Sequence, residues 1–305
     1  MKDRLNKPKG FGEILDVTFS LSKKHFINFF KIFLFLIGPV ILIEALIRAA
    51  FGTSLIRDVA GGTFLEQFTS VFDDPEPYAT SEIIADLWIA LVSFISLFLY
   101  PIAYAAIILA VNRIRKGEEY TVGGVIKQAF SRFWPIIGSS ILFFLILFGM
   151  IIVPNIALLF IGVIGILIHP VIGVILVFIF GLAAFIGLGL LLTRWAFFLG
   201  SVVLKEESPG LSRSWQLTRG RMWASFGLII VFTLIISLVG LAFEFSFMAL
   251  LGHSVLFFTV MNLIMLVTQM ITAVAYSVVY TDLKTRHDAE DIKDLLENYN
   301  GSIQE

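Results

Sequence analysis

The stretch from Phe133 to Thr193 constrains this chain most, because its 61 residues include no Asp, Glu, Lys or Arg. As one continuous helix it would be about 90 Å long, roughly three times the hydrocarbon thickness of a bilayer. It must therefore fold back on itself within lipid. The natural break is the segment from Gly165 to Pro170, since proline is not tolerated in a helix interior. The sequence predicts two membrane-spanning helices here.

Composition supports a membrane protein throughout. Hydrophobic residues make up 58% of the chain and charged residues 15%, against about 25% charged in soluble globular proteins. A net charge of −1 says little about partners, because the charges are sorted by side of the membrane. The absence of cysteine excludes disulfides, thiolate catalysis and Cys-based metal sites.

Hydropathy predicts six spans, at about 28–50, 86–111, 135–165, 171–192, 224–250 and 254–280. With six spans, 20 of the 22 Lys and Arg residues lie on the cytoplasmic side or at its boundary. Three spans within the uncharged stretch would instead move Lys205, Arg213, Arg219 and Arg221 outside. The positive-inside rule favours six spans with both termini in the cytoplasm.

A short amphipathic helix is expected before each pair of spans. The first covers residues 12–25, the second follows an N-cap at Thr121, and the third starts at Ser208-Pro209. Each is followed by an aromatic residue at the predicted membrane edge, namely Phe26, Trp134 and Trp223. The predicted fold is an all-α integral membrane protein whose six transmembrane helices form three hairpins, each preceded by a cytoplasmic amphipathic interfacial helix.

One domain, residues 1–305, is predicted to hold all of this. Residues 1–27 form a cytoplasmic interfacial segment, 28–280 the six-helix membrane bundle, and 281–305 an acidic cytoplasmic tail that includes a short helix.

Charged residues inside lipid are costly and mark candidate sites. Glu44, Arg48 and Glu244 lie at similar depths, so packed spans would place them in one outward-facing polar pocket. The alternative is a local ion pair between Glu44 and Arg48, which are spaced i, i+4.

A basic, aromatic patch is predicted on the cytoplasmic face. Its residues are candidate contacts for lipid headgroups or a protein partner rather than nucleic acid: Arg194, Arg213, Arg219, Arg221 and Trp223.

No residue pattern predicts catalysis. The four histidines have no ligand spacing, and no phosphate-binding glycine loop, G-x-S-x-G, H-E-x-x-H or hydrolytic carboxylate pair is present. We expect no metal, no cofactor and no enzyme activity.

Three segments carry a resemblance: K-G-F-G-E-I-L-D-V-T-F-S-L from Lys9, R-S-W-Q-L-T-R-G-R-M-W from Arg213, and Y-T-D-L-K-T-R from Tyr280. They resemble an uncharacterised bacterial multi-pass family similar to the membrane domain of some glycerophosphodiester phosphodiesterases. The resemblance implies a bacterial plasma-membrane location. It does not imply hydrolysis, because the catalytic barrel of those enzymes has no counterpart here.

Two functions follow as hypotheses. The first is a non-enzymatic membrane module that presents its cytoplasmic helices to a protein partner or anionic lipid. The second is a transporter or lipid-moving protein that uses the outward-facing polar pocket.

Overall fold

The computed structural model describes residues 2–56, 80–252 and 254–303, with side chains over 4–56, 83–252 and 254–288. The acidic loop predicted between the first two spans lies largely outside the described residues.

Long apolar helices dominate the described chain. Six of them are long and apolar enough to cross a membrane: Phe26–Ala50, Ile83–Lys116, Phe133–Ile168, Pro170–Val203, Met222–Leu251 and Val255–Asp288. The chain thus has the six candidate spans that the sequence predicts for an all-α multi-pass membrane protein. Several helices run longer than predicted; α5, for example, covers Thr80–Lys116 where the predicted span is 86–111.

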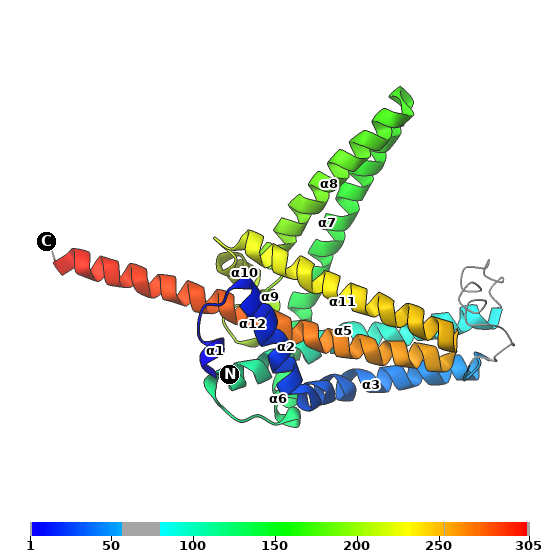
Figure 1. Ribbon diagram of the computed structural model, residues 1–305, viewed down its shortest axis with the longest axis horizontal. Coiled ribbons are helices and arrows are strands. Elements are labelled where there is room, and N and C mark those ends of the chain that lie inside the picture. The colour runs from blue at the N-terminus through cyan, green and yellow to red at the C-terminus, as the bar shows by residue number, and fades with distance from the viewer. Residues whose placement is uncertain (1, 57–79, 253, 304–305) are drawn as a thin grey trace.

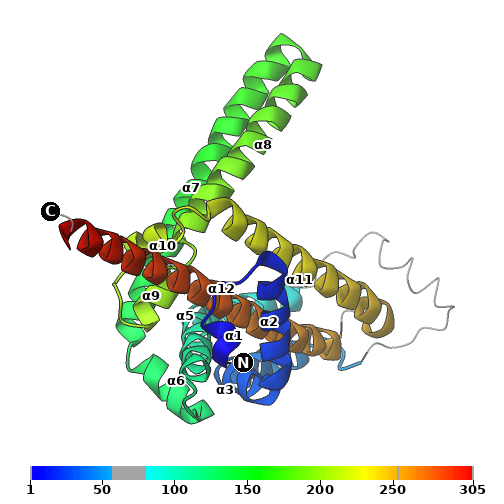
Figure 2. The ribbon, with the colours of Figure 1, turned by 60° about the vertical axis from the view of Figure 1, so that its left-hand side comes forward.

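Four of these helices run alongside one another, as Figures 1 and 2 show. They are α3 (Phe26–Ala50), α5, α11 (Met222–Leu251) and α12 (Val255–Ile303). Helix α12 contacts the other three. We call the end of this bundle where α3 and α11 begin and α5 ends the charged end.

Helices α7 (Phe133–Ile168) and α8 (Pro170–Trp195) pack against each other and project away from the bundle (Figure 1). The predicted break is confirmed, since His169 alone separates them. Between residues 141 and 192 the buried positions are Gly162, Gly165 and Gly173. A Cβ on Gly165 would lie 2.6 Å from the Gly173 Cα, so the two helices approach closely because both residues lack side chains.

The short helices lie at the charged end. They are α1 (Lys2–Leu5), α2 (Phe11–Lys24), α6 (Val122–Phe130), α9 (Phe198–Val203) and α10 (Leu211–Leu217). Helix α2 lies against α12 (Figure 2) and reaches α11, where the rings of Phe19 and Phe232 are 6.4 Å apart.

Two predicted helix starts have different outcomes. Thr121 caps α6 as predicted, accepting a 3.1 Å hydrogen bond from the Gly124 amide. The start at Ser208-Pro209 is wrong, because α10 begins at Leu211. Gly210 has φ +79°, and a Cβ there would lie 2.4 Å from the Phe198 carbonyl, so contact with α9 sets the helix start.

The sixth span and the tail form one helix. Helix α12 continues from Val255 to Ile303, with no break at the predicted boundary after Tyr280. Residues 281–288, predicted as the start of a tail, therefore extend the span as a rigid continuation at the charged end.

Candidate functional site

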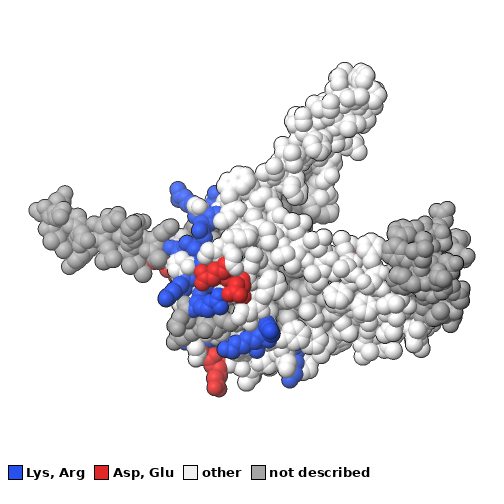
Figure 3. All heavy atoms as spheres, in the orientation of Figure 1, with Lys and Arg blue, Asp and Glu red and all other residues white. Residues whose placement is uncertain are grey.

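Charged side chains gather at the charged end. On the face shown in Figure 3, Lys, Arg, Asp and Glu lie over α1, α2 and the segment near α10, while the rest of the described surface is almost entirely uncharged. Two carboxylates organise the contacts there, the half-buried Glu206 and the buried Asp282.

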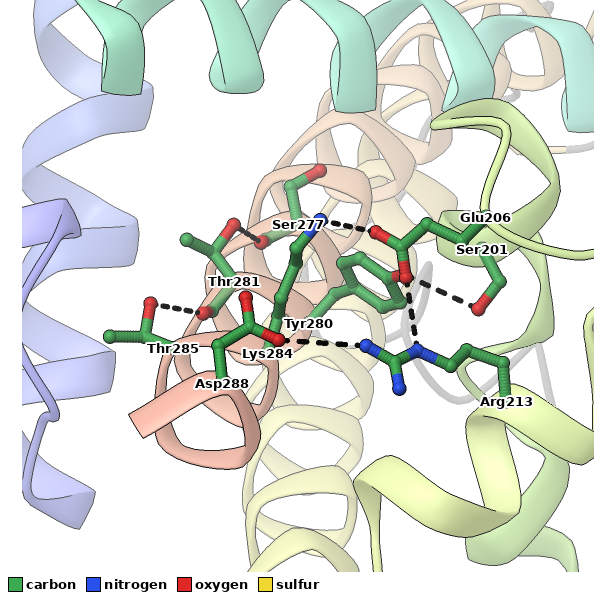
Figure 4. Close-up of polar contacts among 9 residues, drawn as sticks. All are labelled: Ser201, Glu206, Arg213, Ser277, Tyr280, Thr281, Lys284, Thr285 and Asp288. Atoms are coloured by element: carbon green, nitrogen blue, oxygen red, sulfur yellow. Dashed lines mark hydrogen bonds and ion pairs between the residues drawn. The ribbon is translucent and has the colours of Figure 1, made fainter. Parts of the chain in front are cut away.

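Glu206 lies in the turn between α9 and α10 and faces the C-terminal part of α12 (Figure 4). Its Oε2 accepts hydrogen bonds from the Tyr280 hydroxyl at 2.9 Å and from Arg213 Nε at 3.2 Å. Its Oε1 accepts a bond from Lys284. The Tyr280 proton is thus committed to Glu206, so Ser201, 3.2 Å away, donates to the tyrosine oxygen.

Two opposing effects act on Glu206. Burial alone would raise the pKa of its carboxyl, since a charged group is less well solvated inside the protein. The bonds from Lys284, Tyr280 and Arg213 outweigh burial and hold the pKa below its usual value. The Glu206 carboxyl is therefore ionised at neutral pH and holds its three donors as a carboxylate.

Helix α9 approaches α12 through a glycine. A Cβ on Gly200 would lie 2.4 to 2.7 Å from three ring atoms of Tyr280. The Gly200 amide donates to the Tyr276 hydroxyl at 3.1 Å. The absence of a side chain at Gly200 leaves room for the Tyr280 ring against α9.

Asp282 is the second carboxylate that joins segments at the charged end, and its side chain is 3% exposed. It accepts hydrogen bonds from the Lys9 amide at 2.7 Å and from Arg286 Nε at 2.9 Å, and Arg221 lies 3.8 Å away. Arg286 also donates to the Lys9 carbonyl at 2.7 Å. The N-terminal segment is thereby fixed to α12.

The Lys9 side chain turns inward. It is fully buried, and its Nζ donates to the carbonyls of Leu5 and Lys7. Burial lowers its pKa, although the nearby Asp282 acts in the opposite direction.

The three segments that carry the family resemblance converge here. Lys9 begins the first, Arg213 and Arg221 belong to the second, and Tyr280 and Asp282 to the third. They are joined directly by the bonds of Glu206 and Asp282.

An open pocket of about 760 Å³ lies beside Asp282. Its basic lining comes from Arg219, Arg221, Arg286 and His287, and its apolar lining from Pro8, Leu217 and Leu283. The pocket lies just before Met222, where α11 begins, and close to Asp288, where the sixth candidate span ends.

One family matches the chain over residues 8–304, a domain of unknown function (DUF8558). The chain belongs to DUF8558. No curated protein and no solved structure matches it. The family match does not test the similarity to the membrane domain of glycerophosphodiester phosphodiesterases. That similarity stays a prediction.

The structure separates the predicted basic patch into different environments. Arg213 is bonded to Glu206 and lies 3.6 Å from Asp288, while Arg219 and Arg221 line the pocket. Arg194 lies over the Trp215 ring, 4.9 Å from its centroid. Trp223 is exposed at the start of α11.

Glu44 and Arg48 face the bundle, near the end opposite the charged end. Glu44 accepts hydrogen bonds from Ser93 on α5 at 2.6 Å and from Asn262 on α12 at 3.1 Å. Arg48 pairs with Asp86 at 3.7 Å and lies 3.8 Å from the centroid of the Phe258 ring. The local pair between Glu44 and Arg48 is replaced by these contacts, because partners from neighbouring helices are available.

Glu244 is exposed on α11. None of the hydrogen bonds or ion pairs between described side chains joins it to Glu44 or Arg48. Of the three predicted pocket residues, the structure thus brings Glu44 and Arg48 together where α3 packs against α5 and α12, and leaves Glu244 apart.

No sequence pattern indicated Glu206 and Asp282 as the centres of the charged end. Asn262 and Gln269 are recognisable from the sequence as polar residues within a span, but the seven-residue spacing of polar side chains on α5 and α12, which places them on one helix face, was not predicted. These are Asp86, Ser93 and Tyr100 on α5, and Asn262, Gln269 and Tyr276 on α12. Among the described residues, no group of three or more His, Asp or Glu is placed to hold a metal ion.

Proposed function

We propose that this chain is a non-enzymatic module of the bacterial plasma membrane whose charged end faces the cytoplasm and binds anionic lipid there. Its termini lie on that side, and its short helices α2, α6 and α10 lie at the membrane interface. A protein partner at the same surface is the other form of this hypothesis.

One observation carries the proposal: the open pocket beside Asp282 is lined by three arginines at the level where candidate spans end. Arginines at that level attract anionic headgroups, and each cation close to the surface contributes about 1 kcal/mol. The exposed side chains of Trp215 and Trp223 lie on the flanking helices, and tryptophan favours the headgroup region.

The absence of cysteine allows a clean test of topology. Single substitutions Lys116→Cys and Glu207→Cys would be labelled by an impermeant maleimide only after the membrane is broken. His169→Cys, between α7 and α8, would react in intact cells. Labelling of Glu207→Cys from outside would contradict the proposed orientation.

Binding is tested in native membranes with a photoreactive amino acid at Trp215 or Trp223. We expect crosslinks enriched in anionic lipid relative to the bulk membrane. The matched control is the same amino acid at Leu167, an exposed residue near the tip of α7. Equal lipid profiles at these sites, with no protein crosslink, would contradict the proposal.

Transport or lipid movement is the second candidate function, and the contacts of Glu44 favour it. A carboxylate held inside the bundle by Ser93 and Asn262 is unusual in lipid and typical of conduction or exchange sites. If the chain moves lipids, Glu44→Leu should abolish dithionite-accessible exchange of a fluorescent phospholipid in proteoliposomes. Glu244→Leu is the control at an exposed position. Equal exchange in the Glu44 variant and the unmodified chain would exclude this candidate.

A further inference from the structure

The pocket beside Asp282 holds more positive charge than the described side chains neutralise. Arg219, Arg221 and Arg286 line it, and Asp282 is the acidic residue paired with Arg221 and Arg286. Arg219 makes no ion pair with any described side chain. Among the described side chains, these three guanidinium groups and the one carboxylate of Asp282 leave a net charge of +2 at the pocket.

The hydrogen-bond donors of these arginines are also only partly used. Arg286 donates from Nε to Asp282 and from one terminal nitrogen to the Lys9 carbonyl, and its other terminal nitrogen donates to no described residue. Arg221 lies 3.8 Å from Asp282, beyond hydrogen-bond distance. The guanidinium N–H groups of Arg219 and Arg221 thus donate no hydrogen bond to a described residue. Their planar arrangement is suited to the oxygens of a phosphate.

We propose that this pocket recognises a phosphate monoester, as found on a lipid with an unsubstituted phosphate headgroup or on a soluble phosphate. The inference rests on the proposed function and specifies its ligand. A phosphate monoester carries a charge of about −1.5 to −2 at pH 7, which matches the net positive charge that Arg219, Arg221 and Arg286 have beyond the one carboxylate of Asp282. A phosphodiester carries only one negative charge and has fewer free oxygens.

The position and lining of the pocket favour the lipid as the source. Its volume of about 760 Å³ lies within the usual range for small-molecule sites. Leu217, Leu283 and Pro8 provide apolar contacts beside the arginines. The pocket also lies at the start of α11 and near the end of the sixth candidate span, the depth of a headgroup.

The test is titration calorimetry of the full chain in phosphatidylcholine nanodiscs. The three probes are dioctanoyl phosphatidic acid, dioctanoyl phosphatidylglycerol and inorganic phosphate. We expect the monoester lipid to bind about tenfold more tightly than the diester, since one charged hydrogen bond contributes about that factor. Equal affinity for the two lipids would overturn the proposal.

Arg219→Gln is the decisive variant, because Arg219 makes no ion pair with a described side chain whose loss would affect folding. We expect it to weaken phosphatidic acid binding about tenfold. Arg219→Lys should recover only part of the loss, since a lysine cannot form the bidentate bond. Lys127→Gln, an exposed cation on α6, is the matched control and should leave the affinity unchanged. Unchanged affinity in Arg219→Gln would overturn the proposal.

The probes separate the source of the phosphate from the proposed function itself. Tight binding of phosphatidic acid with weak binding of inorganic phosphate supports a lipid ligand, and equal binding supports a soluble phosphate ligand. If both lipids bind equally and Arg219→Gln weakens both, anionic lipid binding stands and monoester recognition fails. If neither lipid binds and crosslinking also finds none, both fail.

Discussion

Replacing Glu206 by Gln is expected to destabilise the charged end, because three donors converge on its carboxylate. Gln keeps the shape of the side chain but removes the negative charge and turns an amide group toward Arg213 and Lys284. The Glu206 side chain is 15% exposed and those of Arg213 and Lys284 are 22% exposed.

The magnitude follows from this partial burial. Exposed ion pairs contribute about 0.2–1 kcal/mol, whereas removal of one partner of a fully buried pair costs about 3–5 kcal/mol. The Glu206 contacts lie between these limits, so we expect a loss of about 2–3 kcal/mol in the free energy of unfolding. A double-mutant cycle with Lys284→Gln should give a coupling energy of about 1–2 kcal/mol.

The assay is unfolding of the full chain by SDS in mixed micelles, followed by circular dichroism. The matched control is Glu207→Gln, because Glu207 is the adjacent carboxylate and makes no ion pair with a described side chain. We expect the control to change the free energy of unfolding by less than about 0.5 kcal/mol. If the two variants are equally stable, the Glu206 contacts do not hold the charged end together.

Three further predictions use the same unfolding assay. The pKa of Glu206 is lowered in the folded chain, so its stabilising contribution is complete above the ordinary value of 4.5 and is lost as the pH falls through the lower folded value. The difference between the unmodified chain and Glu206→Gln should shrink only below about pH 4.5, and a constant difference down to pH 2 would contradict this. Gly200→Ala should lower the free energy of unfolding by about 1–3 kcal/mol, because the new Cβ would overlap the Tyr280 ring. Gly181→Ala is the control, because the space around Gly181 is open, and it should not destabilise the chain. Equal effects of the two substitutions would refute the packing argument. Thr121→Ala should cost about 1 kcal/mol through loss of the cap, while Thr121→Ser should retain most of the stability, and no difference between these variants would exclude the cap.

Local rules predicted the features that depend on a few neighbouring residues. Pro170 marked the break between two helices because proline is disfavoured in a helix interior, although Pro39, Pro101 and Pro154 do lie inside α3, α5 and α7. Thr121 marked a helix start because its hydroxyl needs only the amide of Gly124. The start at Ser208-Pro209 failed for the opposite reason. There the chain is shaped by the contact of Gly210 with the Phe198 carbonyl, which no local pattern contains.

The candidate site needed contacts between distant segments. Arg213, Arg219 and Arg221 were recognised by charge, but the sequence alone could not reveal that Arg213 is bonded to Glu206 while Arg219 and Arg221 line a pocket. Placing a boundary after Tyr280 also hid the continuity of α12 and thus the partners of Asp282.

The intramembrane polar residues explain how α12 is positioned lengthwise. Asn262 bonds Glu44, Gln269 accepts from Tyr104 at 2.6 Å, and Tyr276 accepts from Gly200. Each such bond in lipid contributes only about 0.6 kcal/mol, so together they add little stability. Their effect is on register, because a slide of α12 by one helical turn would separate all three pairs at once. Since α12 is continuous, the same register places its charged C-terminal part against Glu206 and Lys9, and links the polar core of the bundle to the arginine-lined pocket.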